Sequence, residues 1–342
     1  MKLLKSVISV TVFVSMVIAL MIPVSYILRP VDTERERIMG FYAEEEDSLE
    51  AVVVGSSAMY RYINNPYMWK NYGITSYNYA TPGLSLFLVE DLISEIERTQ
   101  SPEVYIIDAR KYALCKTAEL DEIRFQQVAT NMRYSFGRIK MIDKFIDDPI
   151  SKLEYTADIL LYHGNWDQVS KEDLKYWDNA HPHEMKGWST MKKARTIPYT
   201  DVTDLEEEEP IHEAAEEALY SLMNKCKKEN IKLLFVATPW GISEEQQKKS
   251  NYTKRIVEEN GFDYIDMNRL WNEVGMDHEK HFYNKNHVNT PGSEKVTAYL
   301  AEYLQKNYDM DREHSKSVVE SWDKAVETCD KEWAAKMKKS KK

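Results

Sequence analysis

The chain has few of the residues that mark several common protein classes. Among its 342 residues there are three cysteines, 11 glycines and 11 prolines. Cys115, Cys226 and Cys329 lie far apart and form no CxxC pair. A disulfide framework, a zinc finger and an iron–sulfur site are therefore not expected. The low glycine and proline contents exclude collagen-like and low-complexity chains.

An excess of positive charge is also missing, since the formal net charge is −11. We therefore expect no nucleic-acid partner, because nucleic-acid binders usually present a basic face. The sequence contains no G-x-x-x-x-G-K or G-x-G-x-x-G loop, which argues against a phosphate-binding module. The 43% of hydrophobic residues is enough for a sizeable core.

The N-terminus carries a long uncharged run from Ser6 to Leu28. About 20 apolar residues cross the core of a bilayer as a helix. Lys2 and Lys5 precede the run and favour a cytoplasmic N-terminus. A cleaved signal peptide is the alternative, but no A-x-A-like cleavage site precedes Pro30. We therefore expect a single-pass membrane anchor over residues 1–28, with the bulk of the chain extracytoplasmic. The low cysteine content suits a Gram-positive-like cell surface.

Residues 29–50 are polar and acidic and predict a stalk. Over residues 51–310, short apolar runs alternate with amphipathic stretches, which predicts an α/β fold with a parallel, flavodoxin-like sheet and helices on both faces. Residues 110–210 break the alternation and predict a helical insertion. The expected strands are 51–55, 102–108, 231–238 and 262–266, and the expected helices are 86–98, 212–228, 248–259 and 293–307.

The tail, residues 311–342, predicts an amphipathic helix with a basic end. Its apolar residues recur every three or four positions, as on one face of a helix. The helix either packs on its own domain or meets a partner or a membrane surface. The apolar positions are Val318, Trp322, Val326, Cys329, Trp333 and Met337, and the basic end comprises Lys336, Lys338, Lys339, Lys341 and Lys342.

Two polar segments should meet at the carboxyl ends of the strands, where open α/β sheets bind ligands. Ser56 and Ser57 follow the first expected strand, and His287 precedes the last expected helix. A serine hydroxyl needs a neighbouring base, which histidine supplies, and a third group usually orients that base. Asn284, three residues before His287, has the spacing of such a group. Ser57 and His287 as simple helix caps remain the alternative.

Together, these motifs resemble the SGNH (GDSL-like) hydrolase superfamily, and most closely its membrane-anchored, DltD-like branch of Gram-positive bacteria. The resemblance covers about residues 50–305. It rests on five segments in order: Gly55-Ser56-Ser57, Asn65-Pro66-Tyr67-Met68-Trp69, Tyr77-Asn78-Tyr79-Ala80, His163-Gly164-Asn165-Trp166 and Asn284-Lys285-Asn286-His287-Val288-Asn289.

The resemblance implies a role for each motif residue. Ser57 would be the nucleophile and His287 the base. The backbone N–H groups of Ser57 and Gly83 would form the oxyanion hole, and Asn78 would stabilise the turn around Gly83 or add a donor. Ser56 takes the place of the aspartate in the G-D-S motif.

The chain departs from the family pattern at two places. The strand over 102–108 ends in Asp108-Ala109-Arg110 instead of G-x-N-D, which leaves one oxyanion donor open. Asp108 and Arg110 are alternatively a structural ion pair. Asn284 stands where the family has aspartate, and an amide orients an imidazole without stabilising its charge. Weak serine–histidine catalysis, replacement by Asp266 or Asp277, and a degenerate family member all stay open.

We expect an exported, membrane-anchored acyl-ester transferase or esterase that acts on cell-envelope polysaccharide or teichoic acid and needs no cofactor. Its relatives imply a membrane-bound O-acyltransferase as partner. The alternative is a non-catalytic accessory subunit. The His181–His183 pair fits no standard zinc motif, so no metal site is expected. His163 and Trp166 are expected in the core of the insertion rather than at the site.

Overall fold

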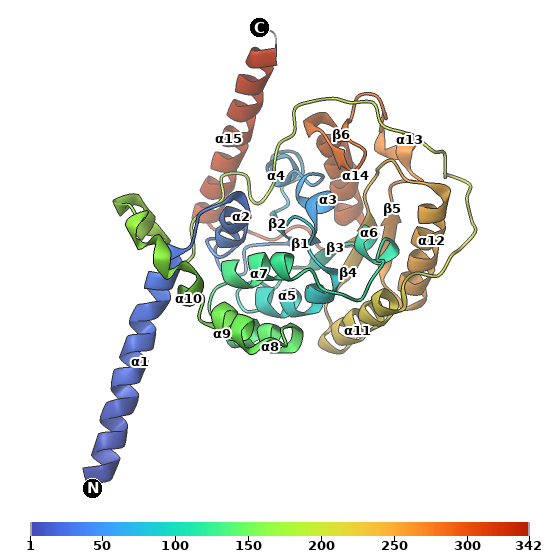
Figure 1. Cartoon of the computed structure of the whole chain (residues 1–342). Coiled ribbons are helices and arrows are strands. Elements are labelled where there is room, and N and C mark those ends of the chain that lie inside the picture. Colours follow the sequence, from blue (N-terminus) through green and yellow to red (C-terminus); the bar gives the residue numbers. More distant parts are fainter. Residues whose placement is uncertain (1, 341–342) are drawn as a thin grey trace.

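The computed structural model describes residues 2–340 and is built around a five-stranded parallel sheet of order β2-β1-β3-β4-β5 (Figure 1). This is the flavodoxin-like order, so the predicted fold class is confirmed. The strands are β1 (Ala51–Gly55), β2 (Ser76–Ala80), β3 (Val104–Asp108), β4 (Leu233–Ala237) and β5 (Asp263–Asp266). Four of them match the predicted runs, whereas β2, an edge strand, was not predicted.

Helices cover both faces of the sheet because every central strand is apolar on both sides. Along β1, Val52 and Val54 belong to one hydrophobic cluster, and Ala51 and Val53 belong to the other. The first cluster includes residues of α5 (Val89–Ile96), α7 (Glu122–Asn131), α11 (Glu213–Glu229) and α12 (Glu244–Glu259). The second includes residues of α3 (Ser57–Tyr60), α4 (Asn65–Tyr72), α13 (Trp271–Val274) and α14 (Thr290–Asn307).

Residues 29–50 pack into the body, so the prediction of an acidic stalk is wrong. Helix α2 (Thr33–Phe41) lies against β2 and buries Arg35 and Arg37. Arg35 donates to the carbonyl of Tyr26, and Arg37 donates to the carbonyl of Gly187 at 3.0 Å. The Arg37 guanidinium also lies over the ring of Tyr60. Carbonyl oxygens and an aromatic face thus allow a charged segment to be buried.

The segment after β3 is helical over its first two thirds. It contains α6 (Ala109–Ala113), α7, α8 (Phe136–Phe145), α9 (Pro149–Thr156), α10 (Ile159–Tyr162) and the 3₁₀ turns η2 (His163–Asp167) and η3 (Lys171–Tyr176). Residues 177–212 form no helix or strand within the described chain, contrary to the prediction of helix there. They are held instead by single backbone bonds, such as Arg195 N–H to Phe282 O at 2.8 Å.

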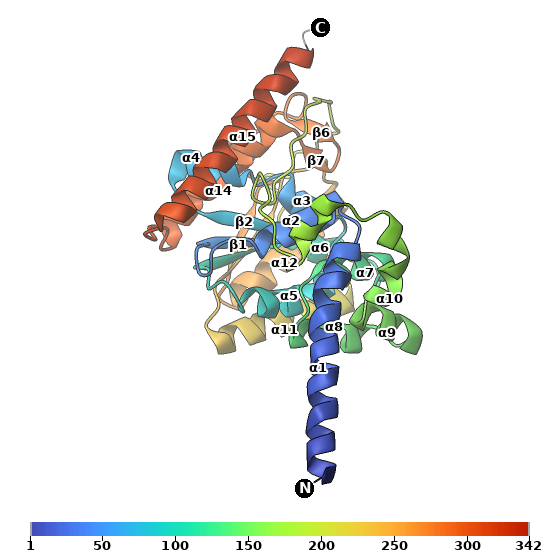
Figure 2. The same ribbon diagram turned by 90° about the vertical axis from the view of Figure 1, so that its left-hand side faces the viewer.

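Two long helices project from the body, α1 (Lys2–Leu28) and α15 (Lys316–Ser340) (Figure 2). Of the helices in the described residues, α1 alone is long and apolar enough to cross a membrane. Both views place the free end of α15 on the opposite side of the body from the free end of α1. Val318 and Trp322 of α15 are buried beside α4, which favours packing on its own domain there. Of the expected basic end, Lys341 and Lys342 lie outside the described residues.

Candidate functional site

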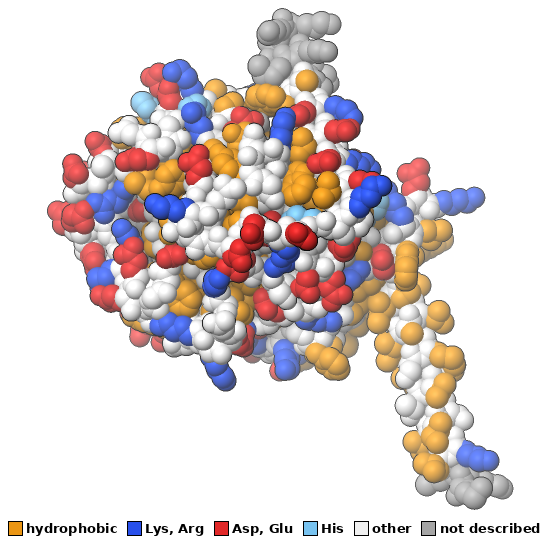
Figure 3. Space-filling model, turned by 180° about the vertical axis from the view of Figure 1, so that it is seen from behind, with side chains coloured by type: hydrophobic (Ala, Val, Ile, Leu, Met, Phe, Trp, Pro, Cys, Tyr) orange, Lys and Arg blue, Asp and Glu red, His pale blue; other side chains and the backbone are white. Residues whose placement is uncertain are grey.

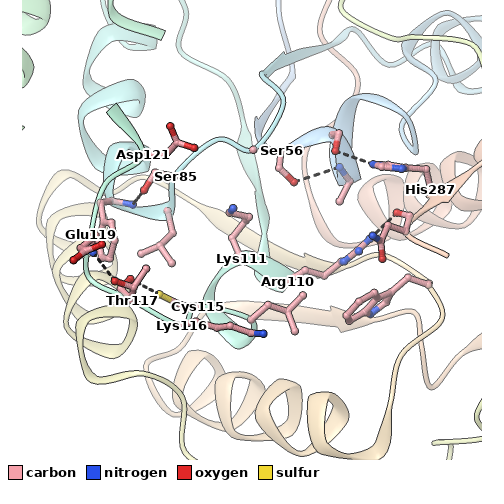
Figure 4. Close-up of a pocket in the computed structure, with 18 residues that line it drawn as sticks. Ser56, Ser85, Arg110, Lys111, Cys115, Lys116, Thr117, Glu119, Asp121 and His287 are labelled. Atoms are coloured by element: carbon pink, nitrogen blue, oxygen red, sulfur yellow. Dashed lines mark hydrogen bonds between the residues drawn. The ribbon is translucent and has the colours of Figure 1, made fainter. Parts of the chain in front are cut away.

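A cleft of about 460 Å³ opens at the carboxyl ends of β1 and β3 (Figure 4). Ser56 and Ser57 follow β1, Arg110 and Lys111 follow β3, and His287 arrives from the short hairpin of β6 (Phe282–Asn284) and β7 (His287–Val288). The other lining residues include Gly83, Leu86, Phe87, Trp240 and Asn286. The cleft therefore lies where a parallel sheet is expected to bind ligands.

Ser57 is placed in the cleft by a sharp turn from strand to helix. A side chain at Gly55 would put its Cβ 2.5 Å from Met59 Cγ and 2.6 Å from Asp108 Cβ, so the turn requires glycine. The hydroxyl of Ser56 caps α3 by accepting from the N–H of Ala58. Ser57 is therefore not the cap, and its own hydroxyl remains available to the cleft.

The structure brings Ser57 and His287 together, with Oγ of Ser57 2.8 Å from Nε2 of His287. The other ring nitrogen, Nδ1, lies 3.0 Å from Oδ1 of Asn284. That oxygen also accepts from the backbone N–H of Asn286 at 2.9 Å. His287 does not cap α14, since Asn289 does so. The three residues thus lie in the order nucleophile, base and orienting group.

These bonds determine which nitrogen of His287 carries the proton. The backbone N–H of Asn286 can only donate, so the amide of Asn284 must present its oxygen there. The same oxygen can only accept from His287, so Nδ1 is the protonated nitrogen. The lone pair of Nε2 therefore faces Ser57 and accepts its hydroxyl hydrogen.

The imidazole of His287 is neutral near pH 7. Burial, and then the positive charges of Arg61 and Arg110, lower its pKa to about 4. Among the described residues no carboxylate contacts its ring, and the partner of Nδ1 is the uncharged amide of Asn284. Neutral imidazole is the form that accepts a proton, but its conjugate acid is poorly stabilised here.

Gly83 also lines the cleft and lies in a tight turn. The N–H of Leu84 donates to the carbonyl of Thr81 at 3.2 Å, with Pro82 and Gly83 between them. The φ of Gly83 is +68°, as the third position of a type II turn requires. Across the part of the chain that the structure describes, the N–H groups of Ser57 and Gly83 donate to no other residue. Both residues line the cleft, so both donors suit a developing oxyanion.

Three further predicted residues, of which only Ser56 lines the cleft, take supporting positions. Asn78 is buried in β2 and donates to the carbonyl of Ile63 at 2.9 Å, so its amide is not available to an oxyanion. The hydroxyl of Ser56 donates to Oδ2 of Asp108 at 2.6 Å. Asp108 is buried and does not line the cleft. It forms this bond with Ser56 in place of the ion pair with Arg110 that the sequence left open.

Sequence reasoning missed Arg110 as a cleft residue. Its guanidinium lies 4.4 Å from the ring centroid of Trp240, and Nη1 donates to Oγ1 of Thr238 at 3.2 Å. Its Nε is buried without a partner among the described residues. Figure 4 shows Arg110 on the same side of the cleft as His287, with Glu119 and Asp121 across from them. The strand-end rule that selected Ser57 applies equally to β3 and would have found Arg110.

The two aspartates considered as substitutes for Asn284 lie elsewhere. Asp266 accepts from Gln247 at 2.6 Å, and Asp277 pairs with Lys280 at 2.7 Å. Neither contacts His287 in the described structure, so Asn284 remains its orienting group. His163 and Trp166 are exposed near α1, so the expectation of a core position is wrong for both.

Comparison with known proteins adds no evidence about the site, which is therefore argued from its geometry alone. No protein-family model matches the chain, and no curated protein matches it. The solved structures to which it is similar include three with low identity and TM-scores below 0.5, which carry no argument of their own. One is a protein assigned to the lipolytic G-D-S-L family from Desulfitobacterium hafniense DCB-2, with 10% identity over 75% of this chain and 99% of that chain and a TM-score of 0.37. Another is a protein assigned as an acylhydrolase from Bacteroides fragilis NCTC 9343, with 11% identity over 81% of this chain and 99% of that chain and a TM-score of 0.39. The third is a lipase/acylhydrolase from Enterococcus faecalis, with 9% identity over 78% of this chain and 100% of that chain and a TM-score of 0.34.

Proposed function

We propose that the chain is a serine–histidine acyl-ester hydrolase or transferase of the SGNH type. The observation that carries the proposal is the alignment of Ser57, His287 and Asn284, with Oγ–Nε2 and Nδ1–Oδ1 distances of 2.8 Å and 3.0 Å. This arrangement lies in an open cleft, beside two unused backbone donors. The proposed reaction uses no cofactor.

In the proposed reaction, Oγ of Ser57 attacks the carbonyl carbon of an acyl ester while Nε2 of His287 takes the hydroxyl proton. The N–H groups of Ser57 and Gly83 bind the oxyanion of the tetrahedral intermediate. The intermediate expels the alkoxide, which receives the proton from His287, and an acyl-Ser57 ester remains. Water or an acceptor hydroxyl then repeats the same steps in reverse and releases the acyl group.

The proposed setting is the outer face of the cytoplasmic membrane, with cell-envelope polysaccharide or teichoic acid as substrate. Arg110, Lys111 and Lys116 line the cleft and suit an anionic polymer. Ser25 and Tyr26 of α1 are buried in the body, which favours a retained anchor over a cleaved signal peptide. A membrane-bound O-acyltransferase is the proposed partner, and the DltD-like branch is the proposed family branch.

The function is tested with the full-length chain in detergent. Hydrolysis of a short p-nitrophenyl ester and labelling by a fluorophosphonate probe are measured for the native chain, Ser57→Ala and Ser85→Ala. Ser85 lines the same cleft and serves as a matched control. We expect Ser57→Ala to lose both signals and Ser85→Ala to keep them. Activity that persists in Ser57→Ala would rule out this nucleophile.

A second candidate function is that of a non-catalytic accessory subunit, and Asn284 is the observation that favours it. An amide next to His287 leaves the imidazolium without a counter-charge. An accessory subunit would give no fluorophosphonate labelling of the native chain, although it would still bind the polymer or the acyltransferase.

A further inference from the structure

We propose that an apolar collar around the exit of α1 enters the headgroup and outer acyl region of the lipid leaflet from which α1 emerges. The collar consists of Leu160 on α10, Trp166 on η2, and Leu174 and Trp177 at η3. Their side chains are 44%, 73%, 54% and 59% exposed. The inference rests on the proposed anchor and is independent of the proposed catalysis.

The length of α1 determines the depth of the collar. The uncharged residues 6–24 are 19 residues and measure about 29 Å at 1.5 Å per residue, close to the hydrocarbon thickness of a bilayer. The next two residues, Ser25 and Tyr26, are buried in the body. The surface of the hydrocarbon core therefore falls near Val24. Helix α10 and the turns η2 and η3 contact α1 and so lie at the level of the lipid headgroups.

Buried polar bonds hold the collar against α1. The side-chain amide of Asn165 donates to the carbonyl of Leu28 at 3.1 Å. Asp158, directly before α10, is fully buried and pairs with Arg29 at the end of α1 and with Arg138 at 3.1 Å. Tyr134 and Ser25 also donate to Asp158. The collar is therefore a fixed part of the junction and keeps its height relative to α1.

The distribution of exposed apolar side chains points to lipid as the occupant. Single exposed hydrophobic residues are ordinary, but clusters mark contact surfaces. In the described body, most large exposed apolar side chains lie within residues 123–177. Besides the collar, this segment exposes Ile123, Phe136, Ile139, Ile150 and Leu153, whereas elsewhere in the described body only Val31, Tyr199 and Tyr220 are comparably exposed. Figure 3 shows that hydrophobic side chains along α1 continue onto the adjoining body. Trp166 and Trp177 favour this reading, because tryptophan is enriched at membrane–water interfaces.

The experiment places spin labels in the full-length chain. In a background of Cys115→Ser, Cys226→Ala and Cys329→Ser, single cysteines carry a nitroxide at Trp166→Cys or Leu174→Cys. The chain is reconstituted in phosphatidylcholine vesicles that contain phosphatidylglycerol. Collision with oxygen, which concentrates in lipid, is compared with collision with a water-soluble nickel chelate. We expect both labels to collide more often with oxygen and less often with the nickel chelate than a nitroxide at a water-exposed position of the same reconstituted chain.

Two controls separate the possible outcomes. Tyr199→Cys should remain open to nickel, because Tyr199 is 44% exposed and its ring packs against Trp271 and His278 rather than against α1. Val14→Cys, in the middle of α1, reports whether the anchor itself inserts. If Val14→Cys is protected while Trp166→Cys and Leu174→Cys match Tyr199→Cys, the collar does not enter lipid and the proposal fails. Protection in native membranes but not in pure lipid vesicles would overturn it in favour of a membrane-protein partner.

Discussion

Oδ1 of Asn284 accepts a hydrogen bond from Nδ1–H of His287, with 3.0 Å between the two heavy atoms, so an uncharged group orients the base of the site. The amide fixes the tautomer that presents a lone pair to Ser57. It provides no negative charge for the imidazolium that forms when Ser57 loses its proton. Alignment and charge stabilisation, which one carboxylate supplies together in serine-protease triads, are therefore separated in this chain.

Replacing Asn284 by aspartate should raise ester turnover. A carboxylate at this distance stabilises the imidazolium and raises the pKa of His287 from about 4. The reverse change costs about 10⁴-fold in a serine-protease triad, where the amide also selects the wrong tautomer. Asn284 holds the correct tautomer, so that figure is an upper limit here. We expect a gain between about 10-fold and that limit in kcat/KM at pH 7. The measurement is p-nitrophenyl ester hydrolysis by the full-length chain.

Asn284→Ala is the control for this substitution, because it removes the acceptor without adding charge. Its kcat/KM should fall below that of the native chain, as Nδ1 loses its partner. An increase in both variants would mean that the gain comes from space rather than charge.

Replacing Arg61 by glutamine should shift the pH profile. His287 acts as a base in its neutral form, so kcat/KM rises with pH through about 4 and is level above it. The charge of Arg61 is the largest cause of this low pKa after burial. Its removal raises the pKa toward 6.5, so the level region should begin at a higher pH. An unchanged inflection in Arg61→Gln would show that His287 is not the titrating base.

Replacing Asp158 by asparagine should destabilise the junction between α1 and the body. The buried carboxylate pairs with both Arg29 and Arg138, whose side chains are 1% exposed. Removing one partner of a buried pair costs about 3–5 kcal/mol of unfolding free energy. Thermal unfolding in detergent, followed by circular dichroism, measures the loss. Asp143→Asn, whose pair with Lys152 is exposed, should change stability by less than about 1 kcal/mol.

Replacing Trp322 by alanine should release α15 from the body. Its ring is fully buried, and the Nζ of Lys186 lies 4.8 Å from the ring centroid. Truncating a buried tryptophan costs about 3–5 kcal/mol. Limited proteolysis should then cut within α15 faster than in the native chain. Trp333→Ala, at a half-buried position further along the same helix, should leave the cleavage rate nearly unchanged.

The sequence predicted the central strands because their residues are apolar on both sides, as in AVVVG over 51–55. It missed β2, whose sequence SYNYA lacks a continuous apolar run. The burial of β2 depends on partners distant in the chain, such as the carbonyl of Arg37, which accepts from the hydroxyl of Tyr77 at 2.7 Å. The buried arginines of α2 were missed for the same reason, since only the folded chain brings carbonyl acceptors to them.

The placement of Ser57 beside His287 was predictable because parallel strands bring their carboxyl ends to one edge. The tautomer of His287 was not predictable, because it depends on the backbone N–H of Asn286 pointing at Asn284. The position of Asn78 was also beyond the sequence. Its motif neighbours suggested support for the turn around Gly83 or a donor to the oxyanion, but the pleat of β2 directs the amide to Ile63.

The junction at Asp158 also limits how an anchored form of this protein reaches its substrate. Only residues 29–32 separate α1 from α2, and Arg29 is already buried. The body therefore has no flexible linker about which it could rotate relative to α1. Ser57 would stay at a fixed height above the membrane surface, and the substrate would have to reach that height. With the proposed polymer as substrate, only the segments that reach this height would be modified.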